Sequence, residues 1–392
     1  MIKDYLKSAE LQDLPNTRDW SSPDEFDLTN KSDQAILKKY LDDGAVDVIC
    51  DPIELVAENL YKIDFPDKLD DEASKIKYVH DLVVQGEKYG NWFYFPWSKE
   101  LVHYPSRNDH MRMRTSRNRN LITEEEQRTL YAATLAIFGM SVGSHVVDSL
   151  VLSGIGGDLI LADADIIEPP NQNRLHADYT DVGVSKVDHV AKRVSKIDPY
   201  IKQTVIKSAV DGESLSEIAE LHHPQIMFDE VDDLAAKASI RLQAEKSGIA
   251  TVMATDLGDK SLIDVERHDL KITRPFNGRL TRKEVELLAS EGSADIAKKA
   301  LAKVIGVRNV TPRLLDSFME QRKTLSGLPQ LGATAITGGA LASVAAREII
   351  LGRKLDSGRY VASYKDILSL KSPTPFRIGL ATLIGFMRYS KS

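Results

Sequence analysis

The sequence of 392 residues predicts an α/β fold in which helices cover both faces of a mostly parallel sheet, with a smaller N-terminal domain. From residue 134 onward, short apolar runs alternate with segments of helical periodicity, as in strands connected by helices. A glycine-containing turn follows the first of these runs. The length also exceeds what one core usually organises, so a second module is expected.

The expected elements of the main domain follow one another in a regular order. A buried strand at 134–138, a helix at 145–153 and a strand at 158–165 make the first βαβ unit. The pattern then repeats, with helices at 187–197, 213–221 and 234–248 and strands at 201–209, 225–231 and 249–256. Residues 281–326 are expected to be helical, because Thr281 with Glu284 forms a capping box and Pro312 follows Thr311. Residues 332–351 should form a helix rich in small residues that suits close packing.

The expected domain boundaries follow changes in composition. Residues 1–105 are acidic and irregular and form an N-terminal module, whose aromatic cluster at 92–97 reads as a core strand. Residues 106–128 form an Arg-rich connector, expected to be a solvated linker over 106–120. Residues 129–355 form the main domain, and residues 356–392 form a C-terminal tail that packs on it.

The composition argues against several classes of protein. A net charge of -7 does not suit a general binder of DNA, which needs clustered lysine and arginine. The single cysteine, Cys50, excludes a disulfide framework and suits a reducing compartment such as the cytoplasm. Residues 1–13 lack the features of a secretory signal, and the apolar run 378–387 is shorter than the ~20 residues that a membrane span needs. We therefore expect a cytoplasmic protein that is not embedded in a membrane.

The turn GMSVGS at 139–144 joins the first strand to its helix. Glycine permits tight turning there, and the N-terminus of the helix offers N–H groups to a phosphate. Gly139, Ser141 and Gly143 are therefore candidate residues of a Rossmann-like nucleotide site.

The same turn also fits the G-x-S-x-G nucleophile elbow of serine hydrolases. In that interpretation Ser141 is the nucleophile, and Asp256 or Asp264 with His268 would complete a triad. Residues 1–130 show neither the earlier strands nor the oxyanion-hole glycine loop that usually precede such an elbow.

Polar residues that suit phosphate chemistry follow the second strand. Asp163 and Asp165 end this strand, and an acid about 20 residues beyond the turn binds ribose in dinucleotide folds. Asn171, Asn173 and Arg174 come next, at the sheet edge where open α/β folds bind ligands. The acid alone would suit NAD equally, but no acid–base pair for hydride transfer stands out.

Two further groups follow later in the chain. Lys186 begins a helix, where a cation can neutralise charge on a transferring phosphoryl group. Asp229, Asp232 and Asp233 end another strand, where carboxylates can hold Mg²⁺ together with phosphates. A helix N-cap is the competing role for Asp233.

Each motif alone is ambiguous, but their order is specific. The glycine turn, Asp-x-Asp, Asn-x-Asn-Arg, Gly-x-x-Lys and Asp-Asp resemble the motifs of the ThiF/MoeB/HesA and ubiquitin-activating-enzyme superfamily, over about residues 114–355. The resemblance implies a homodimer that binds ATP and Mg²⁺. It implies that Asp163 binds the ribose, that Asn171, Arg174 and Lys186 bind phosphates, and that Asp232 lies near Mg²⁺.

The resemblance also has consequences outside these motifs. It implies that an arginine of the connector, Arg117 or Arg119, reaches the ATP of the partner subunit. Pro170, Val231, Asp233 and Ser141 depart from the residues usual in the motifs. The crossover-loop cysteine of the superfamily has no counterpart, and neither do its zinc-binding CxxC pairs, so thioester or sulfur transfer by this chain alone is not expected.

The resemblance implies ATP-dependent adenylylation of a carboxylate, which yields an acyl adenylate and pyrophosphate. Arg174, Lys186, the helix N-terminus after the turn and Mg²⁺ would stabilise the charge of the reacting phosphate. A peptide or ubiquitin-like protein C-terminus, a free small acid and a tRNA-linked carboxylate all stay open as substrates. A degenerate nucleotide-binding scaffold is the other alternative beside the hydrolase.

Overall fold

The computed structural model describes residues 19–84, 86–271, 273–291, 294–306 and 309–370. The expectations for residues 1–13, for the apolar run 378–387 and for the tail beyond residue 370 lie outside these ranges. The chain divides into two compact units, Met1–Glu124 with Ala191–Ile201 and Glu125–Val190 with Lys202–Ser392. Within the described residues, every helix is too short or too polar to cross a bilayer.

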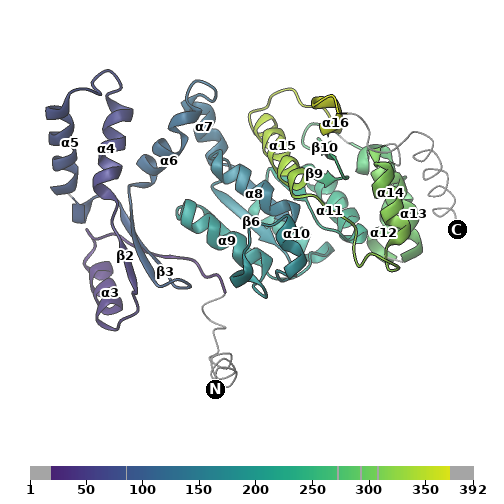
Figure 1. Ribbon diagram of the computed structural model, residues 1–392, viewed down its shortest axis with the longest axis horizontal. Coiled ribbons are helices and arrows are strands. Elements are labelled where there is room, and N and C mark those ends of the chain that lie inside the picture. Colours follow the sequence, from purple (N-terminus) through teal and green to yellow (C-terminus); the bar gives the residue numbers. More distant parts are fainter. Residues whose placement is uncertain (1–18, 85, 272, 292–293, 307–308, 371–392) are drawn as a thin grey trace. The chain divides into compact units, whose positions relative to one another are not determined.

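The first unit is built on a four-stranded sheet with the order β1-β3-β4-β2, of which β2 and β3 are labelled in Figure 1. The aromatic cluster forms β3, and Phe93 and Phe95 are buried, so this segment is a core strand as expected. The strands are β1 (Asp24–Phe26), β2 (Val48–Cys50), β3 (Asn91–Phe95) and β4 (Glu100–Tyr104). The helices are α3 (Lys31–Asp42), α4 (Ile53–Asp64), α5 (Glu72–Val84) and α6 (Arg107–Thr115), with the 3-10 turns η1 (Gly86–Lys88) and η2 (Ser116–Asn118).

The Arg-rich segment is not a solvated linker, and that expectation is wrong for residues 107–115, which form α6. Arg112 pairs with Asp109 at 2.8 Å and also with Asp64, and Arg114 pairs with Asp198 at 2.6 Å. Asp64 and Asp198 come from distant parts of the chain. The local sequence therefore shows the positive charges but not the carboxylates that neutralise them.

The second unit contains a seven-stranded sheet with the order β11-β10-β9-β8-β5-β6-β7. Strands β5 to β9 pair in parallel, and β10 and β11 extend the sheet as antiparallel strands. This arrangement confirms the predicted mostly parallel α/β sheet. The strands are β5 (Thr134–Phe138), β6 (Asp158–Ala162), β7 (Lys202–Ile206), β8 (Ile226–Asp229), β9 (Ala250–Asp256), β10 (Lys260–Glu266) and β11 (Gly358–Ser363).

The helices of the main domain also follow the expected order. Asp233 caps one of them, and Thr281 with Glu284 and Thr311 with Pro312 begin two others as predicted. The helices are α7 (Glu124–Tyr131), α8 (Val142–Leu152), α9 (Lys186–Ile197), α10 (Gly212–His222), α11 (Leu234–Ser247), α12 (Arg282–Glu291), α13 (Ala294–Ile305), α14 (Pro312–Glu320), α15 (Gly332–Ile350) and α16 (Tyr364–Ile367). The 3-10 turns are η3 (Pro169–Asn173), η4 (Tyr179–Asp181) and η5 (Pro275–Gly278).

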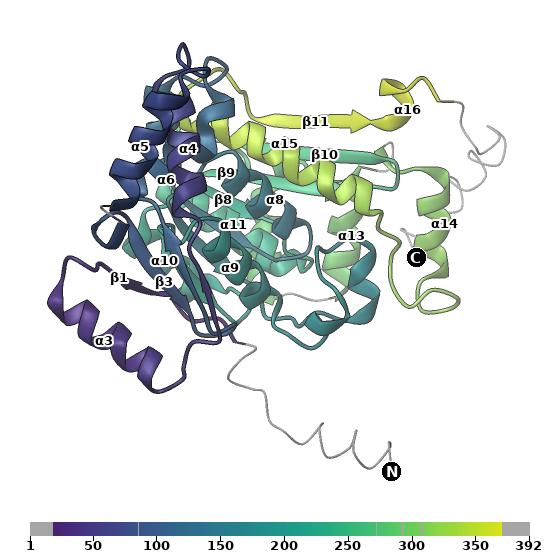
Figure 2. The same ribbon diagram turned by 60° about the vertical axis from the view of Figure 1, so that its left-hand side comes forward.

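Helices cover both faces of this sheet. Ala136 and Phe138 of β5 pack in a core cluster with residues of α10 and α11. On the opposite face, α15 lies beside α8 and over β9 (Figure 1, Figure 2). A Cβ on Gly339 would lie 2.6 Å from the Cβ of His145, so α15 approaches α8 at a point where only glycine fits. The small residues of α15 therefore serve close packing, as expected.

Candidate functional site

The turn between β5 and α8 is built around a glycine that no other residue replaces without strain. Gly139 has φ +90°, a conformation that side-chain-bearing residues rarely adopt. A Cβ at this position would also lie 2.6 Å from the carbonyl carbon of Glu230 and closer still to its oxygen. The turn thus passes directly over the end of β8 and leads into the N-terminus of α8, whose free N–H groups form a natural anion site.

Ser141 and Gly143 lie at the N-terminal end of α8, which begins at Val142. Ser141 is the N-cap residue, but its side chain makes no capping hydrogen bond. Its hydroxyl instead accepts a hydrogen bond of 3.1 Å from Nε of Arg174. A Cβ on Gly143 would lie 3.3 Å from side-chain atoms of Ile137 and Glu230, which leaves little space under the helix start. The structure therefore brings a guanidinium group to the N-terminus of α8.

Asp163 lies at the carboxyl end of β6, and its carboxylate accepts hydrogen bonds from the N–H groups of Met140 and Asp165. These bonds join the turn to the end of the neighbouring strand. Burial raises the pKa of Asp163. Asp165 is exposed and forms a 2.8 Å ion pair with Lys186, the first residue of α9. Asp163, the predicted ribose acid, therefore lies close enough to Lys186, the predicted phosphate lysine, for the charge of the lysine to lower its pKa against the effect of burial.

The residues of η3 have different roles. Asn171 is buried, and its side-chain oxygen accepts a hydrogen bond of 3.0 Å from the N–H of Glu168, which closes the turn. Asn173 donates to the carbonyl of Gln330 and accepts from Nη1 of Arg174 at 3.0 Å. Asn173 thus links Arg174 to the chain before α15.

The three aspartates after β8 separate in space. Asp229 is fully buried, and although burial opposes ionisation, Lys237 and Arg241 hold its pKa below the usual range. The interpretation of Asp229 as a metal carboxylate is therefore wrong, because it belongs to an internal ion-pair network. Asp233 accepts a 2.8 Å hydrogen bond from the N–H of Ala236 and caps α11. Asp232 and Asp233 are both exposed, but only Asp233 is engaged as the cap of α11, so we take Asp232 as the acid available to a ligand.

Two acids near the turn were not assigned to the nucleotide site by the sequence. Glu230 is buried, and one of its carboxylate oxygens accepts from the N–H of Ala254 while the other has no partner. Burial raises its pKa well above the ordinary value. Asp256, at the end of β9, has a pKa raised to about 6 by burial and by the nearby charge of Asp232, while Arg174 opposes this shift. Glu230 and Asp256 come together because β8 and β9 are neighbouring parallel strands, which the sequence alone does not show.

The features predicted for a hydrolase do not assemble around Ser141. Its hydroxyl contacts Arg174 rather than a histidine. Asp264 is held by a charged contact with Arg359, and Nε2 of His268 lies 3.5 Å from Glu266.

The predicted connector arginines, Arg117 and Arg119, belong to the first unit. Arg117 lies in η2 and Arg119 follows it, and both side chains are exposed.

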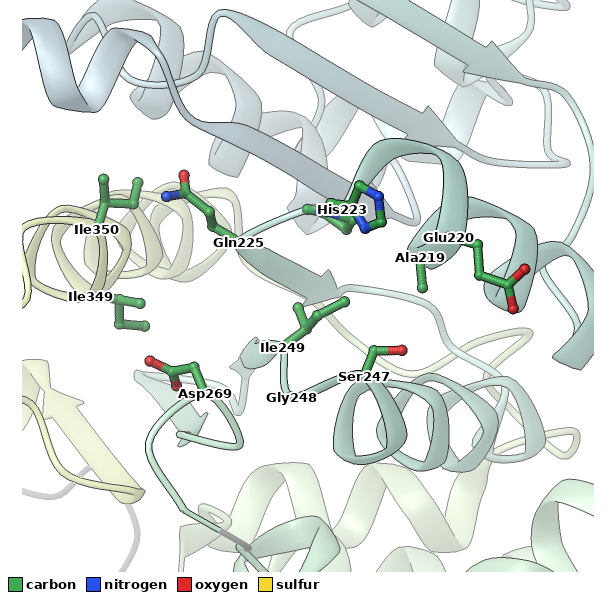
Figure 3. A pocket seen from close by; sticks show the side chains of 11 residues that line it. Ala219, Glu220, His223, Gln225, Ser247, Gly248, Ile249, Asp269, Ile349 and Ile350 are labelled. Atoms are coloured by element: carbon green, nitrogen blue, oxygen red, sulfur yellow. The ribbon is translucent and has the colours of Figure 1, made fainter.

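A pocket of about 560 Å³ lies elsewhere on the main domain (Figure 3). Gln225 and Ile249 line it, and each directly precedes a strand, β8 or β9. Because β5, β8 and β9 are parallel, the pocket lies at the amino ends of these strands. The glycine turn follows the carboxyl end of β5, so the pocket and the glycine turn lie at opposite ends of these strands.

Comparisons with known proteins cover the main domain, and one alignment extends beyond it. The model of the ThiF family matches residues 115–365. The chain is 32% identical over 303 residues to "Uncharacterized protein MT1398" of Mycobacterium tuberculosis (strain CDC 1551 / Oshkosh), an alignment that covers 76% of this chain and 41% of that protein. The chain therefore spans less than half the length of this relative.

A second relative and a solved structure concern the same type of enzyme. The tRNA threonylcarbamoyladenosine dehydratase of Bacillus subtilis (strain 168) is 26% identical over 204 residues, which are 49% of this chain and 80% of that enzyme. The crystal structure of the E. coli tRNA N6-threonylcarbamoyladenosine dehydratase, TcdA, has a TM-score of 0.45 and 19% identity, covering 62% of this chain and 95% of that one.

Proposed function

Because the chain belongs to the ThiF family, we propose that it binds ATP at the Gly139 turn and uses it to adenylylate a carboxylate. A carboxylate oxygen of the substrate attacks the α-phosphorus of ATP. The bond from that phosphorus to the oxygen bridging to the β-phosphate breaks, and pyrophosphate leaves. An acyl adenylate remains for capture by a nucleophile.

The position of Arg174 is the observation that carries this proposal. Its Nε lies 3.1 Å from Ser141 Oγ, so its positive charge stands beside the N-terminus of α8. A helix N-terminus and a guanidinium together favour a phosphate group, through N–H donors, the helix dipole and bidentate hydrogen bonds. Lys186 adds a second cation, and Asp163 supplies the carboxylate for ribose hydroxyl groups. Little covalent work falls to the protein, because alignment and charge stabilisation account for such reactions.

Mg²⁺ fits the acids at the ends of β8 and β9. Asp232 is exposed, and Asp256 carries a buried carboxylate oxygen, Oδ2, without a hydrogen-bond partner. Carboxylate oxygens are hard ligands that Mg²⁺ prefers, usually one or two together with substrate phosphates. We assign the metal to Asp232, with Asp256 beside it. Bound there, Mg²⁺ would neutralise charge on the phosphates of ATP.

The substrate is an acid, either a peptide or protein C-terminus, a free small acid or a carboxylate carried on tRNA. The B. subtilis relative is by name a tRNA-modifying dehydratase, which supports the last class. A homodimer in which Arg117 or Arg119 reaches the ATP of the partner subunit also belongs to this proposal. A cytoplasmic location accords with the single cysteine.

Calorimetry with ATP, AMP and NAD, with and without Mg²⁺, tests the site without requiring the substrate. We expect Mg²⁺-dependent ATP binding that Arg174→Ala abolishes. Arg282→Ala is the matched control, because Arg282 lies on the surface of α12 and pairs with Glu286. No nucleotide binding by the wild-type chain, or equal loss in both variants, would contradict the proposal.

A nucleotide-binding scaffold without catalysis is the second candidate, favoured by the departures at Ser141, Pro170 and Asp233. Asp233 is occupied as the cap of α11. ATP–pyrophosphate exchange with a panel of acids separates the two functions. Exchange with any acid supports the enzyme, whereas ATP binding without exchange over the whole panel supports the scaffold.

A further inference from the structure

We propose that His145, Asp148 and His176 form a binding site for a divalent transition metal such as Zn²⁺, distinct from the nucleotide site. Each of the three residues offers a ligand atom, and these atoms lie within 4.8 Å of one another. His145 and Asp148 lie one turn apart on α8, and His176 comes from the segment after η3. The tertiary structure therefore brings together three metal-binding groups from two segments.

The ligand set suits a borderline cation rather than Mg²⁺. Two imidazoles and one carboxylate are typical of Zn²⁺ sites with three protein ligands and an open fourth position for water. His145 is 3% exposed and Asp148 is 9% exposed, so these ligands are held within the packed domain. The side chain of His176 is half-exposed and forms the solvent-facing side of the site, which provides an entry path for the ion.

His176 already contacts the side chains of the other two residues. Nδ1 of His176 donates to Asp148 at 2.8 Å, and the rings of His145 and His176 meet edge to face with centroids 4.9 Å apart. Metal binding would replace the proton shared by His176 and Asp148, since ligands bind metals in their deprotonated forms.

The surrounding contacts fix the site and connect it to Arg174. Nε2 of His145 donates to the backbone carbonyl of Arg174. Such outer-shell hydrogen bonds orient histidine rings in metal sites. The close approach of α15 at Gly339 confines the backbone of His145. A metal bound here would tie α8 to the segment 174–176 and so restrain the backbone of the arginine beside the glycine turn.

Zn²⁺ titration of the chelator-stripped full chain, in competition with a chromophoric chelator, tests the proposal in the absence of nucleotide. The result is therefore independent of the proposed adenylylation. We expect one Zn²⁺ per chain, and at least ~10-fold weaker binding for His176→Ala and Asp148→Asn, because even outer-shell changes cost about 10–100-fold in affinity. Co²⁺ in the same site should show the visible absorption of a low-coordinate ion, which both variants lose.

His80→Ala is the matched control, because His80 also faces an aspartate, Asp81 at 3.6 Å, but belongs to no cluster of three ligands among the residues that the structure describes. It should bind Zn²⁺ like the wild type. Zn²⁺ should raise the unfolding temperature of the wild type above its own metal-free value, but should not raise that of His176→Ala above the metal-free value of the same variant. No Zn²⁺ binding above a metal-free blank, or equal affinity in the wild type and His176→Ala, would overturn the proposal.

Discussion

Replacing Gly139 by alanine tests whether the turn over β8 is as tightly constrained as the structure indicates. An alanine at φ +90° adopts a left-handed conformation that costs about 1–2 kcal/mol. Its Cβ would also overlap backbone atoms of Glu230 and Val231, the latter at 2.8 Å. Overpacking of this kind costs about 1–3 kcal/mol more. The expected loss in the free energy of unfolding is therefore about 2–5 kcal/mol.

Gly352→Ala separates the two contributions. Gly352 also has a positive φ, +63°, but a Cβ there would meet nothing within 4 Å. This variant should lose only about 1–2 kcal/mol. The effect of glycine on the unfolded chain is the same in both variants and cancels in the comparison.

Urea unfolding with equal m-values measures the difference, which should be about 1–3 kcal/mol in favour of Gly352→Ala. Both positions lie in the second unit, so one transition reports both. Equal losses in the two variants would refute the reasoning, because the contact with Glu230 would then carry no energetic weight.

Three further changes test other parts of the main domain. Arg241→Met should destabilise the domain by about 3–5 kcal/mol in urea unfolding, because Asp229 and Glu266 would lose their buried cation; a loss below ~1 kcal/mol would contradict this. Burial raises the pKa of Asp256 from 3.8 to about 6, so the folded state binds the proton of this carboxyl group more tightly than the unfolded state does. The resulting stabilisation is fully present below pH 3.8 and is lost as the pH rises through about 6. Asp256→Asn should therefore gain stability relative to the wild type between pH 4 and pH 8, by at most about 3 kcal/mol, and a constant difference across this range would argue against the shift. Ser141→Ala should keep measurable ATP binding, and a fluorophosphonate probe should label neither form, whereas labelling of the wild type alone would favour the hydrolase.

Much of the fold follows from local patterns in the sequence. The strands at 134–138 and 249–256 and the helices at 213–221 and 234–248 were predicted almost to the residue, because apolar period and capping residues act over a few positions. Strands β10 and β11 were not predicted. β10 pairs with β9 across a short turn, whereas β11 pairs with β10 from more than ninety residues further along the chain. The pairing of β11 therefore depends on chain closure rather than on local pattern.

The roles of single charged residues were harder to predict. The sequence placed Asp229, Asp232 and Asp233 together after one strand, but only the structure separates a buried ion-pair partner, an exposed acid and a helix cap. The prediction of a solvated linker around Arg112 and Arg114 was wrong for the same reason, because their carboxylate partners are remote in sequence. The sign and number of charges are local properties, whereas burial and pairing are not.

The sequence by itself determined the α/β architecture, the glycine turn and the ThiF family, because these depend on short motifs in a specific order. The tertiary structure decided which groups meet at the turn. It brought Arg174 to Ser141, placed Glu230 under Gly139, set Asp256 near Asp232, and joined His176 to the histidine and aspartate of α8. These contacts join segments from different strands and helices, and their distances follow from the packing of the sheet and its helices, which no local pattern encodes.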